Sequence, residues 1–433
     1  MNRFFILIFV AIFAVSCNKN DELTPAAEVN KTAIAFSNEA ENDSISLSVN
    51  TDWVIEKNAS WLSLSPTAGS GNAVIKVSVG ENAGFEVLHA KITVKVSGIP
   101  DIEIAVSQDR SRETTGLYIL SEGYFGTGTS DIAFYDVKND VFTPKYFNQK
   151  NGRTLGDTGN DLALYGSKLY CVVSGSSGYE GHIEIINPQT GVSQKSVTIT
   201  ENGAVAMPRC ITFYQNKAYI TTFSNTVVRL DTAQLEIDGH AALSGTFAEG
   251  ICHYNGKLYV CNSGQGSGTT VSVVDIASFS EERTLTVPQN PIAIAATSAG
   301  EIYFTTGDLS WNEGPASNLH ILNATSGQVT KTFDVRASRI ALNRDFVYAV
   351  DFDWGNYSDY ICKINLKTQV VTDLADRIED FTMIYNVSIN PANNDVYITN
   401  TGQNVLVWNK NDEEQKRFET GVPSTSKVVA ITR

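Results

Sequence analysis

The eight residues KLYCVVSG at positions 168–175 decide the fold, because variants of this stretch return along the chain at a regular spacing. The stretch has the pattern of a β-strand and carries a tyrosine at its third position. The same tyrosine recurs as Tyr118, Tyr170, Tyr219, Tyr259, Tyr303, Tyr348 and Tyr397. The repeat is about 46 residues long, near the roughly 40–50 residues of one propeller blade. We therefore predict a seven-bladed β-propeller.

A second mark ends the strand that follows each tyrosine, namely Asp136, Asn187, Asp231, Asp275, Asn323, Asn365 and Asn409. Each unit leaves no room for a crossover helix, and a blade needs four strands, here called a to d from the inside out. Residues 116–120 already have the character of strand b, so the first blade lacks strand a. We expect residues 424–432 (STSKVVAIT) to supply it and to close the ring. The seven tyrosines are then core residues between blades.

The composition limits the partners of the protein. The chain has 433 residues, 42% of them hydrophobic, and a formal net charge of −15. This length fits a long propeller over residues 116–433 plus a small module. The acidic balance argues against nucleic acid and against an anionic membrane surface as binding partners.

The first residues, MNRFFILIFVAIFAVSC, have the pattern of an export signal. Arg3 gives a charged start, and the apolar run after it is too short to span a bilayer as a mature helix. The end of the stretch resembles a bacterial lipobox, which implies a signal peptide over residues 1–16, acylation of Cys17 and a tether over residues 17–28. The acidic tether resembles those of lipoproteins exported to the outer-membrane surface. The alternative is ordinary secretion with Cys17 as a free thiol.

Five further cysteines fall within predicted strands: Cys171, Cys210, Cys252, Cys261 and Cys362. Their number is odd, and the hairpin that turns at residues 255–256 should place Cys252 opposite Tyr259 rather than opposite Cys261. We therefore predict buried free thiols and no disulfide framework.

Residues 29–108 alternate with a period of two and have no helical period, which predicts an immunoglobulin-like sandwich. The features Trp53, Trp61 in the string WLSLSP, Gly69, Gly71 and the closing IAVSQ resemble the BACON domain family. That resemblance implies a spacer whose ligand binding is disputed. We expect Trp61 to be a core residue, and the alternative is an exposed platform for a sugar. Residues 109–115 form a polar linker to the propeller.

The predicted loops differ between the two faces of the propeller. The a–b and c–d turns are tight, whereas the other connections are long and rich in glycine and aromatic residues. The long connections cover residues 121–131, 147–159, 174–182, 262–270, 306–317, 351–360 and 375–383. Tight turns would close each blade at lower entropic cost, and long loops on a rigid scaffold are where binding concentrates. We expect one concave site at the centre of the long-loop face.

The expected lining of this site combines aromatic rings and cations. The aromatic residues are Tyr124, Phe125, Tyr179, Trp311, Trp354 and Tyr357, and the cations are Lys150, Arg153, Arg209, Arg339 and Arg377. Rings with a few arginines suit a large, flat or polycyclic, partly anionic ligand through stacking and cation–π contacts. The alternative is that the aromatic residues pack among the loops themselves.

Motifs of metal and nucleophilic catalysis are missing from the sequence. It has no HExxH, no paired CxxC and no GxSxG elbow, and its glycine-rich stretches precede strands rather than helices. We expect that the protein has no cofactor, holds no metal ion with its side chains and is not an enzyme. The acidic pair Asp351 and Asp353 is expected on a solvated face. An acid–base pair assembled in space is the alternative, and with it a lyase or hydrolase.

The stretch GLYILSEGYFG…NGRTLGD and the strings VSVVDIAS and NPIAIAATSAGEIYFTTGD resemble a YncE-like family of surface lipoproteins with seven-bladed propellers. The resemblance covers residues 116–433. It implies capture of a large metal chelate and its transfer to a TonB-dependent outer-membrane transporter. The expected cargo is a ferric catecholate siderophore, because the arginines of an otherwise acidic chain suit a trianionic complex. The alternatives are cobalamin and, from a different class of function, adhesion to glycan or mucin.

Overall fold

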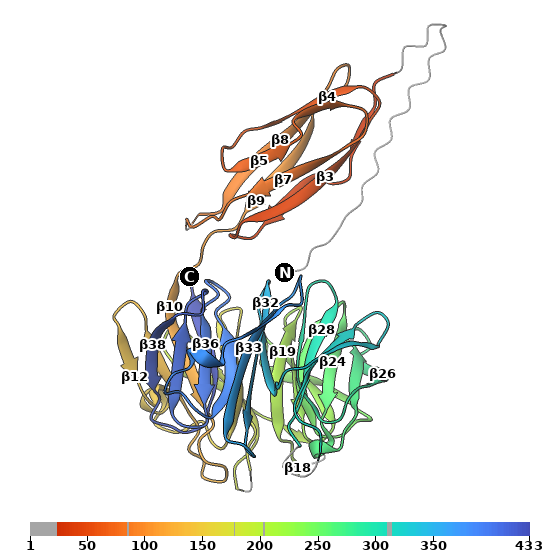
Figure 1. Ribbon diagram of the computed structural model, residues 1–433. Coiled ribbons are helices and arrows are strands. Elements are labelled where there is room, and N and C mark those ends of the chain that lie inside the picture. The colour runs from red at the N-terminus through yellow and green to blue at the C-terminus, as the bar shows by residue number, and fades with distance from the viewer. Residues whose placement is uncertain (1–23, 85, 177, 202–203, 310–313) are drawn as a thin grey trace. The chain divides into compact units, whose positions relative to one another are not determined.

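The computed structural model describes residues 24–84, 86–176, 178–201, 204–309 and 314–433. The predicted signal peptide, Cys17 and Trp311 lie outside these residues. The chain divides into two compact units, Met1–Ser111 (unit 1) and Arg112–Arg433 (unit 2). Both consist of β-strands, and the very short helical segments of the described residues lie in unit 2, so the predicted all-β class is confirmed (Figure 1). Within the described part of the chain, no helix is both long and apolar enough to cross a membrane.

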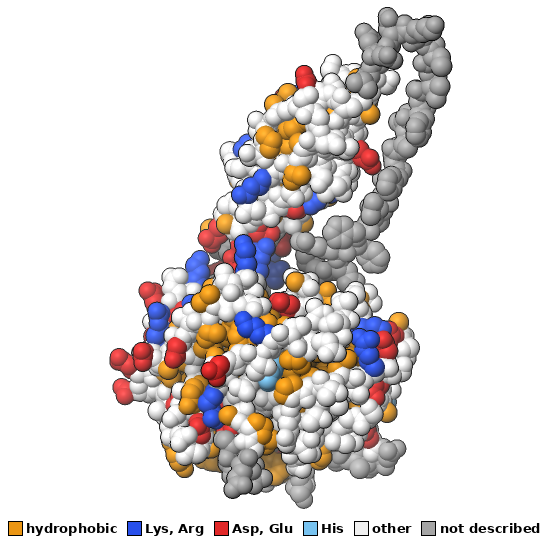
Figure 2. Space-filling model, turned by 45° about the vertical axis from the view of Figure 1, so that its right-hand side comes forward, with side chains coloured by type: hydrophobic (Ala, Val, Ile, Leu, Met, Phe, Trp, Pro, Cys, Tyr) orange, Lys and Arg blue, Asp and Glu red, His pale blue; other side chains and the backbone are white. Residues whose placement is uncertain are grey.

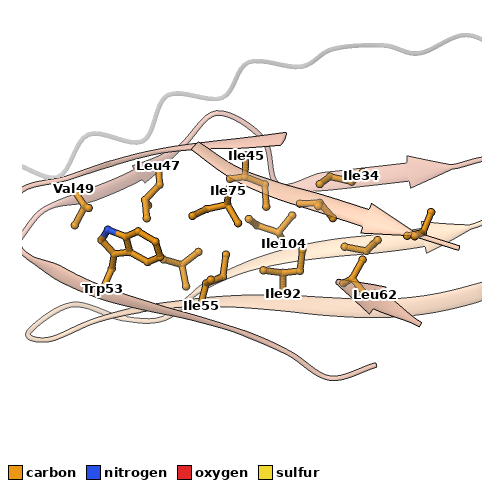
Figure 3. Close-up of a cluster of buried hydrophobic side chains, with 14 of the residues drawn as sticks. Ile34, Ile45, Leu47, Val49, Trp53, Ile55, Leu62, Ile75, Ile92 and Ile104 are labelled. Carbon is orange, nitrogen blue, oxygen red and sulfur yellow. The ribbon is translucent and has the colours of Figure 1, made fainter. Parts of the chain in front are cut away.

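Unit 1 contains two sheets that enclose one core. One sheet has the order β1 (Ala27–Val29), β3 (Glu41–Val49), β7 (Ala73–Val79) and β5 (Leu62–Ser65); the other has β2 (Ala33–Phe36), β9 (Ile102–Gln108), β8 (Leu88–Val96), β4 (Asp52–Lys57) and β6 (Ala68–Ser70). Because successive strand residues point to opposite faces, the alternating apolar residues of each sheet meet inside. Figure 3 shows Ile45 and Ile75 from one sheet facing Ile92 and Ile104 from the other.

Both tryptophans of the BACON-like stretch belong to this core. Trp53 is buried, and its indole N–H donates a 2.9 Å hydrogen bond to the Gly71 carbonyl. Gly69 packs on the same ring, since a Cβ at Gly69 would lie only 2.6 Å from Trp53 Cζ2. Trp61 is partly buried against the core, as predicted.

Unit 2 contains seven four-stranded antiparallel sheets in its described residues, here numbered sheets 1 to 7. In the order a to d, sheet 1 is β39 (Thr425–Thr432), β10 (Thr114–Ser121), β11 (Asp131–Asp136) and β12 (Val141–Thr143). Sheet 2 is β13 (Gly159–Tyr165), β14 (Lys168–Val173), β15 (His182–Ile186) and β16 (Ser193–Thr198); sheet 3 is β19 (Pro208–Tyr214), β20 (Lys217–Thr222), β21 (Thr226–Asp231) and β22 (Glu236–Ala242). Sheet 4 is β23 (Ala248–Tyr254), β24 (Lys257–Asn262), β25 (Thr270–Asp275) and β26 (Ser280–Thr286); sheet 5 is β27 (Pro291–Ala296), β28 (Glu301–Thr306), β29 (Leu319–Asn323) and β30 (Val329–Phe333).

Sheet 6 is β31 (Arg339–Leu342), β32 (Phe346–Asp353), β33 (Ser358–Asn365) and β34 (Val371–Asp373); sheet 7 is β35 (Ile384–Ile389), β36 (Val396–Asn400), β37 (Asn404–Trp408) and β38 (Glu414–Glu419). The connections hold α1 (Tyr146–Asn151), the small hairpin β17 (Thr200–Glu201) and β18 (Ala204–Val205), and the 3-10 helices η1 (Gly264–Gly266) and η3 (Ala375–Arg377). The C-terminal strand β39 therefore belongs to the same sheet as β10, and Val428 pairs with Ile119.

The innermost strands contact one another from sheet to sheet, in the order β39, β13, β19, β23, β27, β31 and β35, and β35 also contacts β39. Their first residues are joined side by side. Ser426 Oγ donates to the Gly159 carbonyl at 3.1 Å, and Asn386 Nδ2 donates to the Ser426 carbonyl at 2.6 Å. Because hydrogen bonds join the first residues of neighbouring inner strands, these strands run in the same direction. All b–c connections therefore lie at one end of unit 2, and each d–a connection leads back to that end, which we call the long-loop end; β18 marks it at the bottom of Figure 1.

The two repeated marks have separate structural roles. The seven tyrosines are at most 3% exposed, so the prediction that they are core residues is confirmed. The Asp and Asn marks shape the c–d turns, because their side-chain oxygens accept hydrogen bonds from backbone N–H groups two or three residues later. Asn323 Oδ1, for example, accepts from the N–H groups of Thr325 and Ser326 at 3.0 and 2.8 Å.

The five cysteines of unit 2 are free thiols, as predicted. Four are buried, and burial raises the pKa of the Cys362 thiol to about 12. Cys252 pairs with Tyr259, in the predicted register. Cys210 differs from the expectation of full burial, because it is partly exposed on the inner strand β19.

Candidate functional site

Five exposed aromatic side chains lie at the long-loop end of unit 2. They are Tyr124, Phe125, Tyr179, Trp354 and Tyr357, with exposed fractions of 66%, 73%, 37%, 51% and 76%. They are the only aromatic residues among the large exposed hydrophobic side chains of the described chain, and each lies in a b–c connection. Each was expected at this end, and the high exposure of Tyr124 and Phe125 argues against simple packing of these two rings between loops.

A buried carboxylate holds the loop that carries Tyr124 and Phe125. Asp157 is fully buried, and its carboxylate accepts hydrogen bonds from the N–H groups of Gly126 at 2.9 Å and Gly128 at 3.3 Å. Both glycines have positive φ, 80° and 62°, which glycine adopts without strain. The loop tip is thus fixed from below, while its two aromatic rings remain in solvent.

The aromatic residues form two groups rather than one. A Cβ at Gly128 would lie 2.2 Å from the Tyr179 ring, so Tyr179 packs on the loop of Tyr124 and Phe125. Trp354 and Tyr357 belong to sheet 6 and pack edge-on against Phe352, with ring centroids 4.7 and 6.3 Å away. Sheet 7 lies between sheets 6 and 1 in the order of inner strands, so the two groups occupy separate parts of the long-loop end.

Arg209 lies at the start of an inner strand, near the centre of unit 2, as predicted. Its Nε donates to Glu249 Oε2 at 3.0 Å, and Nη1 donates to Asn160 Oδ1 at 2.7 Å. The guanidinium also lies over the Phe223 ring, 4.5 Å from its centroid. Burial acts to lower the pKa of Arg209, but nearby carboxylates outweigh it and the net pKa shift is upward. Arg209 is therefore a charged residue with its partners already in place.

Arg339 also reaches this centre, but its partners differ. It forms no ion pair with any carboxylate of the described residues; its Nη1 donates to the Ser338 carbonyl at 3.0 Å, and its guanidinium lies 5.9 Å from the centroid of Tyr385. The Tyr385 hydroxyl in turn donates a 2.7 Å hydrogen bond to Glu122 Oε1. Burial raises the pKa of the Glu122 carboxyl, and Tyr385, Arg209 and Arg339 offset that rise only in part. We call Glu122, Arg209, Glu249, Arg339 and Tyr385 the central cluster.

The other predicted cations do not join this cluster. Lys150 is exposed on α1, which contacts the outer part of sheet 1, and its ammonium lies 5.0 Å from the Tyr146 ring centroid. Arg153 Nη2 donates to the buried Glu184 at 2.9 Å. The prediction that Arg377 lines the site at the long-loop end is wrong, because its Nη1 donates to the carbonyls of residues 411 and 412 in a c–d turn at the opposite end. The three-residue strand β34 ends before the chain reaches the long-loop end.

The prediction that Asp351 and Asp353 lie on a solvated face is also wrong, because both side chains are buried. Arg336 lies between them and Asp308, with N–O distances of 3.2, 3.2 and 2.7 Å. Buried carboxylates need such a cation and hydrogen-bond donors to offset the loss of water. The three aspartates therefore form a structural network around Arg336.

Four residues of the centre were not expected from the sequence: Asn160, Glu122, Glu249 and Tyr385. Three of them share one position. In GNDLALY, PRCITFY, AEGICHY and IYNVSI, the second residue of the inner strand is Asn160, Arg209, Glu249 or Tyr385. Alignment of the inner strands alone could have found them. Glu122 follows β10, and its contact with Tyr385 joins residues 263 apart in the sequence. Within the described chain, no group of His, Cys, Asp or Glu side chains is placed to hold a metal ion.

The fold and site define an all-β protein with an aromatic, charge-containing loop end above seven four-stranded sheets. Residues 115–399 match the family described as a domain of unknown function, DUF5074, and the chain belongs to this family. Residues 51–109 match the BACON family, an N-terminal module that its description proposes to be a binding domain. The second match confirms the predicted BACON-like module.

The chain is also similar to three known proteins or structures. It is 29% identical over 106 residues to the xyloglucan-specific endo-beta-1,4-glucanase BoGH5A of Bacteroides ovatus, covering 24% of this chain and 21% of that relative. The structure of the Bacteroides ovatus GH5 xyloglucanase with a XXXG heptasaccharide has 27% identity and a TM-score of 0.20, over 21% and 20% of the two chains. Kuenenia stuttgartiensis hydrazine synthase has 13% identity and a TM-score of 0.51, and covers 62% of this chain and 93% of that one, which indicates a likeness of fold alone.

Proposed function

We propose that unit 2 is a closed seven-bladed β-propeller of the YncE-like kind. Seven four-stranded sheets, the sheet-to-sheet contacts of the inner strands and the pairing of β39 with β10 support this arrangement. A closed ring leaves no unpaired inner edge and gives its loops a rigid support. The long-loop end is then one face of a disc, with the central cluster at its middle.

We propose that this face captures a large metal chelate, and that a ferric catecholate siderophore is the preferred ligand. The observation that carries the proposal is that five exposed aromatic residues lie at the same end of unit 2 as Arg339, which has no carboxylate partner in the described residues. A catecholate complex offers flat rings for stacking and an excess of negative charge for the arginine. Each cation–π contact contributes only about 0.5–2 kcal/mol, so tight binding requires several contacts around one bulky ligand.

We also propose that the protein acts at the cell surface. Acylation of Cys17 would hold the protein at the outer-membrane surface, and a TonB-dependent transporter would receive the cargo. The chain enters unit 2 at Thr114, the first residue of β10, and the long-loop end lies at the other end of that strand. The chain therefore does not enter unit 2 through the loops proposed to bind ligand. Cobalamin is the second cargo of the same class.

The direct test mixes the purified protein with ferric enterobactin or with cobalamin, removes free ligand by desalting and records the colour that stays with the protein. We expect retained ferric catecholate, and tryptophan quenching that weakens at high salt. Arg339→Gln should reduce retention, whereas Arg377→Gln, at the opposite end, serves as the matched control. Retention of cobalamin alone would reverse the order of ligands. Retention of neither would reject chelate capture.

Glycan binding is a second candidate, favoured by a separate observation. The BACON match and the similarity to a xyloglucan-specific glucanase both point to a module found with carbohydrate-active proteins. Retention of the protein on a xyloglucan or mucin surface, lost when residues 29–110 are removed, would support this function. Unchanged retention after that removal would assign any glycan binding to unit 2.

A further inference from the structure

At the centre of the long-loop end, Glu122 lies close to Arg339, which has no carboxylate partner among the described residues. Glu122 follows β10, and its backbone N–H donates a 2.9 Å hydrogen bond to the Ser424 carbonyl, which fixes its position. Its side chain accepts from Tyr385, whose ring lies beside the Arg339 guanidinium. Glu122 is thus tied by its backbone and by its carboxylate, and it shares Tyr385 with Arg339.

The charges around Glu122 come from four other strands. Arg209 on β19 and Arg339 on β31 are positive, Glu249 on β23 is negative, and Tyr385 on β35 is a neutral donor. Burial is the largest effect on the pKa of Tyr385 and raises it, so the hydroxyl stays protonated. Lys427 and Asp161 lie on adjacent inner strands with Lys427 Nζ 3.7 Å from Asp161 Oδ1, so their charges offset each other. With Glu122 ionised the cluster of two arginines and two glutamates is neutral, and with Glu122 protonated it carries one positive charge.

Arg209 is already engaged by Glu249, Asn160 and Phe223, whereas the contacts of the Arg339 guanidinium with described residues are a backbone carbonyl and the Tyr385 ring. An anionic ligand group at the centre would therefore act on Arg339 and meet the repulsion of Glu122. We propose that Glu122 is a specificity-determining residue that competes with anionic ligands for Arg339, so that binding of an anionic oxygen group takes up one proton at Glu122. The proposal deepens the proposed function, because it assigns a regulation to the same site.

The direction of the pH dependence follows from this competition. A ligand anion near Glu122 raises the pKa of that carboxyl further, and the ligand-free pKa is already raised by burial. Between the ligand-free and the ligand-bound pKa of Glu122, affinity falls as pH rises, by at most about tenfold per pH unit for one linked proton. Above both values, and below both, affinity is independent of pH. A neutral ligand would not show this dependence.

The test uses pyrenetetrasulfonate, a flat polycyclic anion with no group that titrates near neutral pH, and measures its fluorescence anisotropy with the full chain between pH 5 and pH 8. We expect wild-type affinity to rise as pH falls. Glu122→Gln, which keeps an acceptor for Tyr385, should bind tightly at every pH. Arg339→Gln should lose binding by tenfold or more throughout, and Arg377→Gln should behave as wild type. Thermal unfolding of each variant shows that it is folded.

Several results would overturn the inference. Wild-type binding that does not change with pH, or a Glu122→Gln variant that keeps the wild-type pH dependence, would exclude Glu122 as the linked group. Absence of probe binding would exclude an anion subsite at Arg339. In that case retention of cobalamin would still support the proposed function, because a neutral ligand does not need this subsite. Failure of the inference and failure of chelate capture are therefore distinguishable.

Discussion

The Tyr348 hydroxyl donates a 2.7 Å hydrogen bond to Oδ1 of Asp412. Tyr348 lies on β32 of sheet 6, whereas Asp412 lies in the c–d turn of sheet 7, so the bond joins two sheets. Tyr118 and Tyr259 make the same kind of link, to the carbonyls of Pro188 and Ala324 in the c–d turns of sheets 2 and 5. These three tyrosines therefore fill the core of their own sheet and also link it to the next sheet.

This relationship predicts that a tyrosine-to-phenylalanine substitution has different effects on stability at positions 348 and 303. Tyr348→Phe removes the inter-sheet bond and leaves the buried Asp412 with one partner fewer, so the free energy of unfolding should fall by about 1–3 kcal/mol. Tyr303→Phe is the matched control, because the buried Tyr303 hydroxyl has no hydrogen-bond partner among the described residues and should cost little to remove. Urea unfolding measures both. Equal losses would show that the bond contributes no stability.

The aromatic pair of the first loop should matter for binding and not for stability. Tyr124 and Phe125 are mostly exposed, so Tyr124→Ala with Phe125→Ala should leave the midpoint of thermal unfolding nearly unchanged. Loss of two ring contacts should weaken ligand binding by about tenfold or more, because about 1.4 kcal/mol corresponds to a factor of ten. Titration with ferric enterobactin measures the effect. Val141→Ala, on the outer strand β12, is the control, and full affinity in the double variant would place the ligand elsewhere.

Asp157→Ala should weaken binding by a different route. The substitution leaves the N–H groups of Gly126 and Gly128 without their acceptor, so the loop should lose its fixed shape while both aromatic rings remain. We expect weaker ligand binding together with a loss of about 1–3 kcal/mol in unfolding free energy. Hydrogen exchange at residues 123–129 reports the loop directly. Unchanged exchange would show that Asp157 does not hold it.

The repeat could be predicted from the sequence because each of its marks acts locally. The tyrosine packs within a strand of fixed period, and the Asp or Asn bonds to backbone groups two or three residues later. Exposure of Tyr124 and Tyr357 also followed from local features, namely long loops rich in glycine. The number of sheets and the exposed aromatic groups thus depend on short stretches of sequence.

The charges of the site could not be predicted in the same way. Arg153, in the connection between sheets 1 and 2, pairs with Glu184 on sheet 2, and Arg209 on sheet 3 pairs with Glu249 on sheet 4, at separations of 31 and 40 residues. No pattern within one repeat states which cation is neutralised by its neighbour. The position of Arg377 depends on the unexpected shortness of β34, which ends the outer strand after three residues. Side-chain pairing between distant segments and the length of β34 therefore do not follow from short stretches of sequence.

His320 predicts a loss of stability in mild acid. This side chain on β29 is 3% exposed, and burial lowers its pKa to about 4. The pKa of His320 in the folded state is below its ordinary value. The contribution of neutral His320 to the free energy of unfolding is therefore complete above about pH 6.5 and is lost as pH falls toward 4. Between pH 7.5 and 4.5, the free energy of unfolding of His320→Gln should fall by on the order of 2–3 kcal/mol less than that of the wild type. Urea unfolding at the two pH values measures this, with the exposed His240→Gln as a control that should follow wild type.

Val428 tests whether the last strand completes unit 2 in solution. It lies on β39, is 3% exposed and pairs with Ile119 on β10. Val428→Asp would place an uncompensated charge in the core between the first and last strands of the unit, which should cost on the order of 4 kcal/mol. Val370→Asp is the matched control, because Val370 is 58% exposed and a charge there should change stability by less than about 0.5 kcal/mol.

Unfolding by urea compares these two valine variants, and binding adds a second readout. Ser426 and Lys427 precede Val428 and contact the inner strands β13 and β35 near the central cluster. Displacement of β39 should therefore also weaken binding of the ferric catecholate, whereas Val370→Asp should leave it unchanged. Equal stability of the two variants would mean that β39 does not hold the ring together, and both the closed propeller and the central site would have to be abandoned.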